Sequence, residues 1–470
     1  MKTHINFKIA FVVTLLSSIF LFSCERDVDD LSAPGFSNNP YIFTDNFIGL
    51  GSDFYFPYAG SKFTAFSVDQ REGYNSNSSI RIDVPNANDA NGNYAGGIFR
   101  IDGPGRNLSA YNALTFWVKA SQGVTIGEFG FGEDFFPNKF ITTVPNVSVG
   151  TNWSKVIIPI PDASKLVEER GVFRYAAGTQ GTNGNGYILW IDDMKFENIG
   201  TIAHPRGTIA FGNDITETSF IGVNSDIEGI KYIVNMANAK DLNVNASPNF
   251  FTFISSDPKV ATVSEKGVIT TIGPGTTKIT AKIGANDAKG SITIISLGNF
   301  TPAPVPSRPA TNVISIFSDT YQNAPVNYYN GYWAPWQTTV SNDFGVQGNN
   351  ILNYNLFNFV GIEFSSPTIN ASTMTHVHLD VYIPGPVAAG RELRVLVVDF
   401  GANGTFQGGD DTRHSTTFRA PTLVSGSWVS IDIPFSSMTT LASRSNLAQL
   451  ILEGGDGSSL YVDNIYFYKQ

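Results

Sequence analysis

The sequence has little sulfur and little charge. Its single cysteine, Cys24, has no partner within the chain, so a disulfide framework does not stabilise these 470 residues. Lysine and arginine number 30 against 40 aspartates and glutamates, and the formal net charge is −10. No basic stretch could neutralise a run of phosphates, which argues against nucleic acid as a ligand.

Long hydrophobic runs are also scarce. The longest, residues 9–22, is shorter than the roughly 20 residues that a membrane-spanning helix needs. It follows Lys2 and Lys8 and ends just before Cys24, an arrangement typical of a secretory signal peptide at residues 1–23. Nothing further along the chain predicts a transmembrane segment.

The stretch "LFSC" that ends at Cys24 resembles the lipobox of bacterial lipoproteins, in which the cysteine is lipidated and becomes the mature N-terminus. The alternative is an ordinary signal peptide followed by a free thiol. Four acidic residues follow within residues 25–30, and they resemble the Bacteroidetes signal that sends lipoproteins to the outer face of the outer membrane. These resemblances imply a lipidated acidic tether at residues 24–35 and attachment to the cell outer membrane by acyl chains.

What the sequence has in abundance is glycine, phenylalanine and tyrosine, with 45, 36 and 18 residues. Runs such as "LTFWVKA", "WSKVIIPI", "LRVLVVDF" and "WVSIDIPF" are apolar or alternating and lie between Gly, Pro and Asn turns. Such runs are typical of β-strands, and long amphipathic helical patterns are absent. The sequence therefore predicts an all-β fold.

The chain also repeats itself at a spacing of about 270 residues. "YIFTDNF" matches "SIFSDTY", "NLSAYNALTFWVKA" matches "NASTMTHVHLDVYI", and "WSKVIIPI" matches "WVSIDIPF". "WIDDMKF" matches "YVDNIYF" in the same order. The repeat predicts two jelly-roll-type β-sandwiches, at residues 36–199 and 311–470.

Both copies resemble carbohydrate-binding modules of the β-sandwich type, in the "W…IPI" strand and in the closing "WIDD" or "YVDN" strand. The C-terminal copy gives the closer resemblance, with "NFVGIEF", "HVHLDVYIP" and "LYVDNIYFY" similar to modules of flavobacterial polysaccharide-degrading proteins and surface glycan-binding lipoproteins. The resemblance implies that the chain binds carbohydrate.

Residues between the two copies carry a different pattern. "SSDPKVATVSEKGVITTIGPGTTKITAKIG" resembles the bacterial Ig-like domain of group 2, which implies an Ig-like β-sandwich at residues 204–298 that acts as a spacer. The segment "FTPAPVPSRPA" follows, and its prolines predict a semi-rigid, extended linker at residues 299–310.

Aromatic residues crowd the stretch "NYYNGYWAPWQ", residues 327–337. Gly331 and Pro335 indicate a loop, from which several rings cannot all reach a core. Proteins bind sugars by stacking aromatic rings on C–H faces, so the stretch is either a glycan platform or a packed loop. The candidate glycan-binding residues are Tyr328, Tyr329, Tyr332, Trp333 and Trp336.

Strand alternation gives a second candidate face. In "THVHLDVY" the apolar residues point one way, so His378, Asp380 and Tyr382 share the opposite face, and the same register turns Trp117 outward in the N-terminal copy. This face either binds glycan or is covered by loops. A third interpretation is a zinc or copper site at His376, His378 and Asp380.

Four further aromatics, at equivalent places in the two copies, are interpreted as packing residues: Trp153 and Trp428 before the "IP" strands, and Trp190 and Tyr461 in the closing strands. The module resemblance also implies a structural calcium between the first and last strands. In this sequence that carries over to Asp45 with Asp192 or Asp193, and to Asp319 with Asp463, because hard carboxylate oxygens suit calcium.

Motifs for catalysis are lacking: there is no GxSxG, no HExxH and no phosphate-binding glycine loop before a helix. We therefore expect a protein that is not an enzyme. The function predicted is capture of a polysaccharide, such as the β-glucan laminarin, at the cell surface, for a polysaccharide-utilisation system with an outer-membrane importer as partner. The alternatives are a surface adhesin or structural spacer and, third, a polysaccharide hydrolase or lyase.

Overall fold

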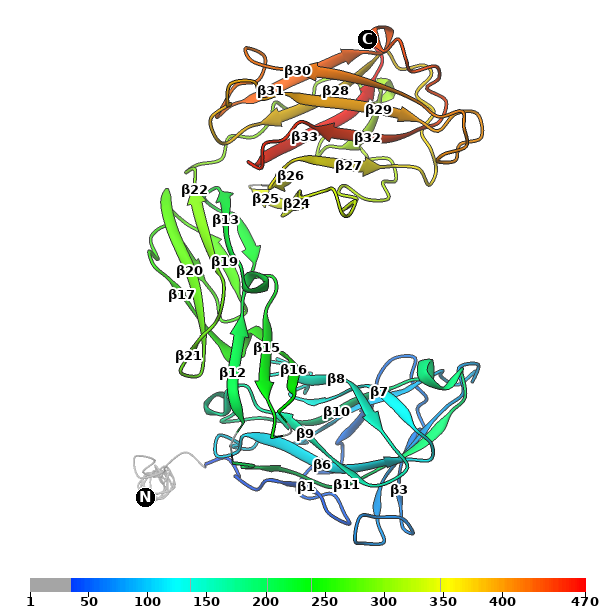
Figure 1. Ribbon diagram of the computed structural model, residues 1–470, viewed down its shortest axis with the longest axis vertical. Coiled ribbons are helices and arrows are strands. Elements are labelled where there is room, and N and C mark those ends of the chain that lie inside the picture. Colours follow the sequence, from blue (N-terminus) through cyan, green and yellow to red (C-terminus); the bar gives the residue numbers. More distant parts are fainter. Residues whose placement is uncertain (1–34, 136, 201, 238, 347) are drawn as a thin grey trace, which may run out of the picture.

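The computed structural model describes residues 35–135, 137–200, 202–237, 239–346 and 348–470. The predicted signal peptide, Cys24 and all but the last residue of the predicted tether lie outside these ranges. Within them the regular elements are β-strands and short 3₁₀ turns, as the sequence predicts (Figure 1). No helix in this part of the chain is long and apolar enough to cross a membrane.

The N-terminal sandwich packs two sheets around an aromatic core. Phe99, Phe116, Phe129 and Phe173 are fully buried between them, and their rings contact one another edge to face, stacked or tilted. The first sheet has the order β3 (Phe66–Asp69), β4 (Ser79–Val84), β11 (Tyr187–Glu197), β6 (Ala113–Ala120) and β9 (Ser154–Pro159), with β1 (Tyr41–Phe43) beside β11. The second has the order β2 (Tyr55–Pro57), β5 (Ala95–Arg100), β10 (Gly171–Ala177), β7 (Val124–Phe131) and β8 (Thr142–Val149).

The Ig-like region joins this sandwich through a shared sheet. A ribbon of β12 (Ala203–Thr208), β15 (Lys231–Asn235) and β16 (Asp241–Ala246) continues the second sheet, because β16 pairs with β8. The Ig-like region itself has two sheets. The first has the order β13 (Asp214–Ser219), β22 (Ser291–Ser296), β20 (Gly275–Ile283) and β17 (Phe251–Ser255), with β21 (Asn286–Asp287) beside β20. The second has the order β14 (Asn224–Asp226), β19 (Val268–Thr271) and β18 (Ala261–Val263).

The C-terminal sandwich repeats the plan of the first one. Its first sheet has the order β24 (Val340–Ser341), β26 (Asn349–Asn355), β33 (Leu460–Tyr468), β28 (His376–Tyr382) and β31 (Trp428–Pro434), with β23 (Val313–Phe317) beside β33 and β25 (Phe344–Val346) beside β26. Its second sheet has the order β27 (Phe359–Glu363), β32 (Leu447–Glu453), β29 (Leu393–Asp399) and β30 (Thr412–Phe418). Each closing strand also has a bulge with one residue in the left-handed conformation, which is Asp193 in β11 and Asn464 in β33.

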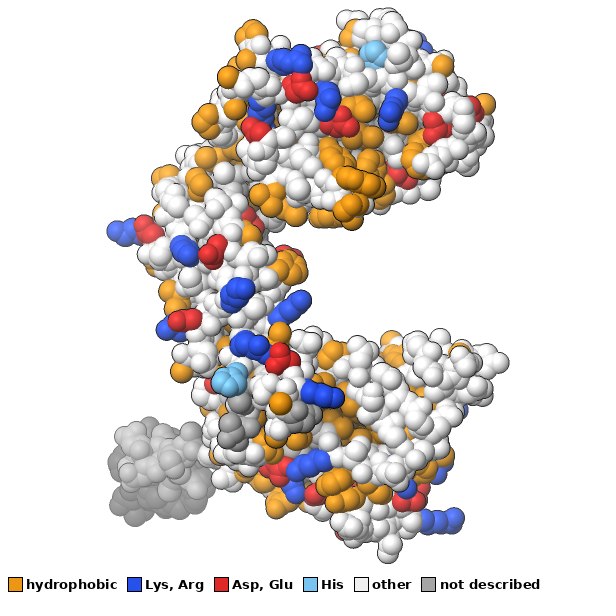
Figure 2. Space-filling model, viewed as in Figure 1, with side chains coloured by type: hydrophobic (Ala, Val, Ile, Leu, Met, Phe, Trp, Pro, Cys, Tyr) orange, Lys and Arg blue, Asp and Glu red, His pale blue; other side chains and the backbone are white. Residues whose placement is uncertain are grey.

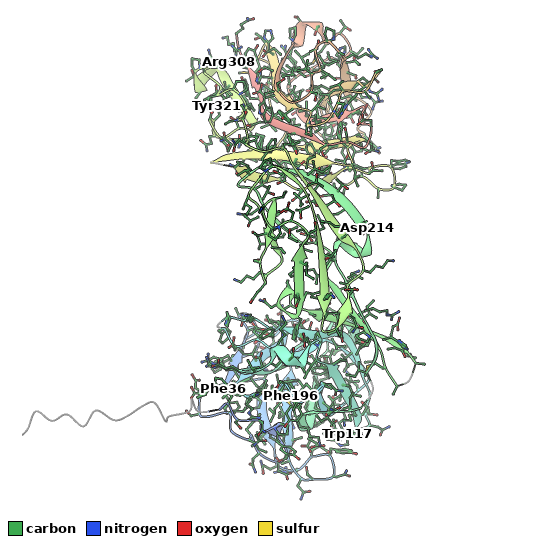
Figure 3. The ribbon with its side chains drawn as sticks, turned by 90° about the vertical axis from the view of Figure 1, so that its left-hand side faces the viewer. Phe36, Trp117, Phe196, Asp214, Arg308 and Tyr321 are labelled. Atoms are coloured by element: carbon green, nitrogen blue, oxygen red, sulfur yellow. The ribbon has the colours of Figure 1, made fainter. Side chains whose placement is uncertain are left out.

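The proline-rich segment does not hold the C-terminal sandwich apart. It lies against the outer face of that sandwich's first sheet: the Arg308 guanidinium sits 3.5 Å from the centre of the Tyr468 ring, and the Pro304 carbonyl accepts a hydrogen bond from Asn464. Figure 3 shows Arg308 beside Tyr321, whose hydroxyl donates to the Arg308 carbonyl. Prolines lack the N–H groups that would need partners there, so the segment covers an aromatic sheet face at little cost in unpaired donors.

Candidate functional site

The aromatic loop, residues 327–337, is fixed to the edge of the second C-terminal sheet. Tyr328 and Glu363 of β27 exchange backbone hydrogen bonds, and the Gly331 amide donates to the Gly361 carbonyl. The Asn330 side chain accepts from the Tyr332 amide, and the Trp333 amide donates to Gln337. The loop is therefore built from its own polar side chains and does not depend on a ligand for its path.

The five predicted aromatic residues of this loop divide into three groups. Trp336 is 73% exposed and Trp333 is half-buried on the outer face of the sheet, against Val398 and Ile451. The Tyr328 hydroxyl points at the same face, because it donates to the Glu363 carboxylate. Tyr332, 57% exposed and in a left-handed conformation, contacts Ser341 outside this face.

Tyr329 does not belong to the surface, contrary to the sequence prediction. Its ring packs against Phe317 at the side of the core, and its hydroxyl donates to the Ile316 carbonyl. Its place next to Tyr328 explains the error: in an extended stretch successive side chains point to opposite sides, so only one of two adjacent tyrosines faces the solvent.

A groove of about 810 Å³ runs along this face of the C-terminal sandwich. The aromatic loop forms one wall, and the loop between β29 and β30 forms the other. Figure 2 shows hydrophobic side chains gathered on this sandwich around β27, with acidic and basic side chains beside them. The groove is lined by Tyr328, Trp333, Trp336, Phe359, Glu363, Val398, Phe406, Asp411, Thr412, Arg413, Gln449 and Ile451.

Glu363 is the polar centre of the groove. Its carboxylate accepts hydrogen bonds from the Tyr328 hydroxyl at 2.7 Å, the Gln449 amide at 2.9 Å and the Ser365 hydroxyl at 2.7 Å. Partial burial acts to raise the pKa of Glu363, but the three hydrogen bonds outweigh it and leave the pKa below its ordinary value. Burial and this carboxylate raise the pKa of Tyr328 to about 12. The centre therefore holds a carboxylate anion and a neutral phenol.

The opposite wall, residues 400–411, is ordered by its own carboxylates. Asp410 accepts hydrogen bonds from the Ala402 amide and the Asn403 side chain, and Asp411 accepts from the Gln407 amide. These contacts fix the path of the loop through its own acidic side chains. The loop presents Phe406, which is 61% exposed, across the groove from the tryptophans.

The face of β28 is closed, which corrects the second predicted site. Asp380 is 1% exposed and His378 is 8% exposed, beneath the proline-rich segment. Asp380 accepts from Ser430 and Asn464, and His378 lies 2.9 Å from Asp432. Burial acts to lower the pKa of His378, but the neighbouring Asp380 and Asp432 raise it above its ordinary value.

Tyr382, at the end of the same strand, packs under Phe220 of the Ig-like region. His376 stacks on Tyr468 at the other end. The zinc or copper interpretation gains no support, because the described residues contain no group of three or more His, Cys, Asp or Glu that could hold a metal. The alternative that this face is covered is the one that the structure has.

Trp117 of the N-terminal sandwich is also covered. Tyr74, from the loop between β3 and β4, stacks on its ring at 3.9 Å between centroids and 12° between planes. The sequence predicted an outward Trp117 correctly but gave no sign that a local tyrosine would occupy its ring face.

Sequence reasoning missed the face of the N-terminal sandwich that is equivalent to the groove. There Arg100 of β5 stacks over Phe56 at 4.4 Å, and Arg174 of β10 contacts Glu128 and Glu133. Tyr58 donates to Glu133, which together with burial raises the Tyr58 pKa. The alternation of "GGIFRI" and "GVFRYAA", which turns both arginines outward on adjacent strands, was the available signal.

The predicted calcium positions come together in pairs. Asp192 is buried and accepts from the Tyr74 amide and the Ser76 hydroxyl; burial, and to a smaller extent the nearby charge of Asp45, raises its pKa. Burial raises the pKa of Asp463 to about 7, and the charges of Asp319 and Asp380 contribute. Asp193 turns away into an ion pair with Lys195.

These carboxylate pairs carry surplus negative charge, and oxygen donors of this kind suit calcium. Each pair would still need backbone or amide oxygens to complete a calcium shell, since the described residues contain no group of three or more His, Cys, Asp or Glu that could hold a metal by themselves.

Family comparison adds to this geometry. Carbohydrate binding domain 30 matches residues 40–198, and the bacterial Ig-like domain matches residues 250–296. The first match covers the N-terminal sandwich, although the C-terminal copy gave the closer resemblance in sequence. Carbohydrate-binding modules are a non-catalytic class, which is consistent with a protein that is not an enzyme. No curated protein sequence matches the chain.

Several solved structures resemble parts of the chain. The family 11 carbohydrate-binding module of Clostridium thermocellum, in complex with a β-1,3-1,4-mixed-linked tetrasaccharide, is 20% identical, with 34% of this chain and 96% of that one covered and a TM-score of 0.25. A family 30 module is 17% identical, with 34% and 98% covered and a TM-score of 0.26. The CBM22 tandem of Paenibacillus barcinonensis Xyn10C is 10% identical, with 93% and 99% covered and a TM-score of 0.23.

Proposed function

We propose that this chain is a lipid-anchored glycan-binding protein of the cell surface that captures polysaccharide through the groove of its C-terminal sandwich. The observation that carries the proposal is the groove itself: exposed Trp336 and Phe406 stand on opposite walls, with Trp333 between them on the floor. Rings in this arrangement can stack on the C–H faces of sugars, and Glu363, Gln449 and Arg413 can exchange hydrogen bonds with hydroxyl groups.

The charge of the groove favours a neutral glycan. Glu363 and Asp411 lie in it with one cation, Arg413, and the lowered pKa of Glu363 keeps this residue ionised at neutral pH. A polyuronate or sulfated chain would meet like charge there. A β-glucan such as laminarin fits this requirement, and we propose it as the ligand.

The N-terminal residues support a place of action at the cell surface. We propose that Cys24 is acylated and holds the chain on the outer membrane, that the acidic tether directs it to the outer face, and that the Ig-like region carries the groove away from the lipid. Captured polysaccharide would pass to an importer or hydrolase of the same polysaccharide-utilisation system.

We further propose calcium as a structural ion at Asp45 with Asp192 and at Asp319 with Asp463. Calcium would offset the surplus charge of each pair between the first and last strands of its sandwich. The test is thermal unfolding of EDTA-treated chain with and without calcium, which should raise the melting temperature. Asp319→Asn should reduce this gain, whereas Asp287→Asn, a largely exposed acidic residue of the Ig-like region, should not.

Affinity electrophoresis against a panel of neutral and acidic polysaccharides tests the main proposal. We expect retardation by a neutral glucan, and a loss of about tenfold in affinity for Trp336→Ala, the usual effect of removing an anchoring aromatic. Phe63→Ala is the matched control, since Phe63 is 76% exposed on the other sandwich. Retardation by no glycan, together with retention of a surface protein, would favour the adhesin alternative. New reducing ends or unsaturated products would favour the hydrolase or lyase.

A further inference from the structure

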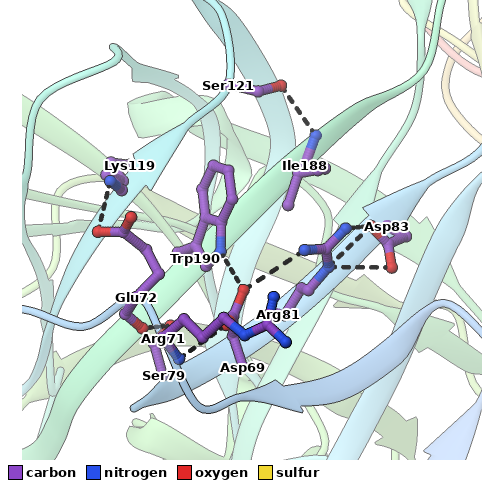
Figure 4. Close-up of polar contacts among 10 residues, drawn as sticks. All are labelled: Asp69, Arg71, Glu72, Ser79, Arg81, Asp83, Lys119, Ser121, Ile188 and Trp190. Atoms are coloured by element: carbon purple, nitrogen blue, oxygen red, sulfur yellow. Dashed lines mark hydrogen bonds and ion pairs between the residues drawn. The ribbon is translucent and has the colours of Figure 1, made fainter. Parts of the chain in front are cut away.

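Several polar networks outside the groove consist of charges that pair with one another. Around Trp190 of the N-terminal sandwich, the indole N–H donates to Asp69, which also pairs with Arg81 (Figure 4). Lys119 pairs with Glu72 beside them. Because the charges there are paired, this network indicates a structural role.

The wall loop of the groove, residues 400–411, contains an asparagine that is followed by a glycine. Asn403 is exposed, and Gly404 has no side chain to shield its backbone nitrogen. An asparagine in such a pair can lose its side-chain amide, because the nitrogen of the next residue can attack the side-chain carbonyl carbon and close a five-membered ring. This reaction needs a glycine nitrogen that is not held in a hydrogen bond.

The glycine nitrogens of the Asn–Gly pairs differ in this respect. The pairs lie at residues 91–92, 183–184, 185–186, 330–331 and 403–404. The first four glycines all use the N–H group: Gly92 donates to the Asp89 carbonyl, Gly184 to the Thr179 carbonyl, Gly186 to the Asn86 side chain and Gly331 to the Gly361 carbonyl. The Gly404 N–H, by contrast, donates to no group in the described part of the chain.

The carbonyl group of the Asn403 side chain is also polarised. Its Oδ1 accepts hydrogen bonds from the Thr405 amide at 2.7 Å and from the Thr405 hydroxyl at 2.8 Å. When a nitrogen adds to the carbonyl carbon, negative charge develops on this oxygen, and donors that are already aimed at it stabilise the charge. Thr405 therefore provides the donors of an oxyanion hole for attack by Gly404.

We propose that Asn403–Gly404 is the pair of this chain that deamidates first, and that the reaction opens the wall of the groove. The Gly404 nitrogen gives its proton to solvent base and bonds to the Asn403 Cγ, and the Cγ–Nδ2 bond breaks as ammonia leaves with a proton from solvent. Water then adds to one of the two carbonyls of the succinimide ring and opens it to aspartate or isoaspartate. The reaction consumes water and involves no change of oxidation state.

The product carries a charge where the wall loop needs a donor. In the intact loop the Asn403 Nδ2 donates to the Asp410 carboxylate at 2.7 Å, and Asp410 also accepts from the Ala402 amide. A carboxylate in place of the Asn403 amide puts two anions at this contact, and they repel each other. Phe406 stands on the same loop, so its place across the groove should be lost. This effect on glycan binding rests on the proposed function of the groove.

Peptide mapping by mass spectrometry tests the reaction itself. The chain lacking its signal peptide is kept folded in mildly alkaline buffer, which favours loss of the Gly404 proton, and is digested after increasing times. We expect Asn403 to be converted before the asparagines of the other four pairs, with aspartate and isoaspartate as products. Thr405→Val keeps the amide donor and removes the hydroxyl donor, so it should slow conversion of Asn403 severalfold and leave the other pairs unchanged.

The proposal is overturned if another pair is converted before Asn403, or if Asn403 stays intact while the chain is folded. An equal rate in Thr405→Val would overturn the part given to the Thr405 hydroxyl.

Asn403→Asp fixes the aspartate product and tests its consequence. Hydrogen exchange followed by mass spectrometry should show faster exchange at residues 400–411 and no change in the rest of the sandwich. Affinity for the retained polysaccharide should fall about fivefold to tenfold, the usual effect of removing an anchoring aromatic. Asn91→Asp, the same substitution in an exposed Asn–Gly pair of the N-terminal sandwich, is the matched control and should change neither measurement.

Far-UV circular dichroism and the melting temperature verify that each variant is folded. Unchanged exchange at residues 400–411 in Asn403→Asp would overturn the opening of the wall. If no glycan retards the parent chain, the proposed function of the groove fails, whereas the peptide map and the exchange measurement still decide whether Asn403 reacts and whether the loop depends on it.

Discussion

The indole of Trp333 lies directly on the backbone of Gly361. A Cβ added at Gly361 would stand 2.4 Å from two atoms of the indole ring, closer than any real contact allows. The absence of a side chain at Gly361 thus leaves the space in which the Trp333 ring packs against β27. The position of Trp333 in turn determines the floor of the groove. One residue without a side chain positions one of the chain's six tryptophans.

Gly361→Ala should therefore damage glycan binding without unfolding the sandwich. The methyl group displaces the Trp333 ring, whereas the strand backbone itself accepts alanine. We expect weaker retardation by the best polysaccharide of the panel and a changed near-UV circular dichroism signal. Gly345→Ala is the control, since its Cβ would meet nothing nearer than 3.7 Å. Unchanged retardation in Gly361→Ala would show that the Trp333 position does not matter for binding.

The second wall of the groove gives an independent test. Phe406 is 61% exposed, so Phe406→Ala removes little buried surface and should change the melting temperature by no more than a degree or two. If the ring closes over a bound glycan, affinity should fall about fivefold to tenfold. Isothermal titration with an oligosaccharide of the retained glycan measures this. A ligand that sits only on the tryptophans would bind Phe406→Ala as tightly as the parent chain.

The sequence was sufficient to predict the all-β fold and the repeat, and it offered exposed aromatics on residues 327–337 as one of two alternatives, because these depend on short-range patterns. Strand alternation places Val377 and Leu379 in the core, and a crowded loop with Gly331 and Pro335 cannot bury every ring. Such patterns involve residues that are close together in the sequence, so they can be recognised without knowledge of tertiary contacts.

The closed face of β28 could not be predicted in this way. Alternation correctly turned His378, Asp380 and Tyr382 outward, but outward from one sheet is not outward from the molecule. Whether such a face is open depends on residues far away in sequence, here Phe220 and the segment that contains Pro304. Nothing in the local pattern distinguishes a covered outer face from an open one.

The stability of the C-terminal sandwich should depend on the protonation of Asp463. Its folded pKa, about 7, is raised above the ordinary value of an aspartate, so the folded state binds a proton that the unfolded state releases between about pH 4 and pH 7. In calcium-free buffer the free energy of unfolding should therefore fall as pH rises through this window. Calcium at the site would favour the charged carboxylate and reduce this fall.

Urea unfolding at pH 5 and pH 7.5, with EDTA present, measures the effect. Asp463→Asn removes the titrating group and should flatten the difference between the two pH values. Asp410→Asn, a substitution in the groove loop of the same sandwich, should leave that difference in place. An equal slope in Asp463→Asn and the parent chain would assign the pH dependence to another group.

The junction between the Ig-like region and the C-terminal sandwich should behave as a packed core. Phe220 is 2% exposed, and its ring contacts Phe300, Phe344, Tyr382 and Tyr461. Phe220→Ala removes these contacts and leaves a cavity, a change that typically costs about 3–5 kcal/mol in a core. Because the junction is also held by the Tyr461 hydroxyl, which donates to Thr218 at 2.6 Å, the loss should loosen the joint rather than unfold either unit.

Small-angle X-ray scattering of the parent chain and Phe220→Ala separates these outcomes, and we expect a broader distance distribution for the variant. In thermal unfolding the variant should show a separate step at low temperature for the C-terminal sandwich. Its retardation by polysaccharide should be preserved, because the groove lies on the other sheet. Phe211→Ala, 66% exposed in the Ig-like region, should scatter like the parent chain. An unchanged profile in Phe220→Ala would mean that the proline-rich segment and the hydrogen bonds across the junction hold the C-terminal sandwich in its place without the Phe220 ring.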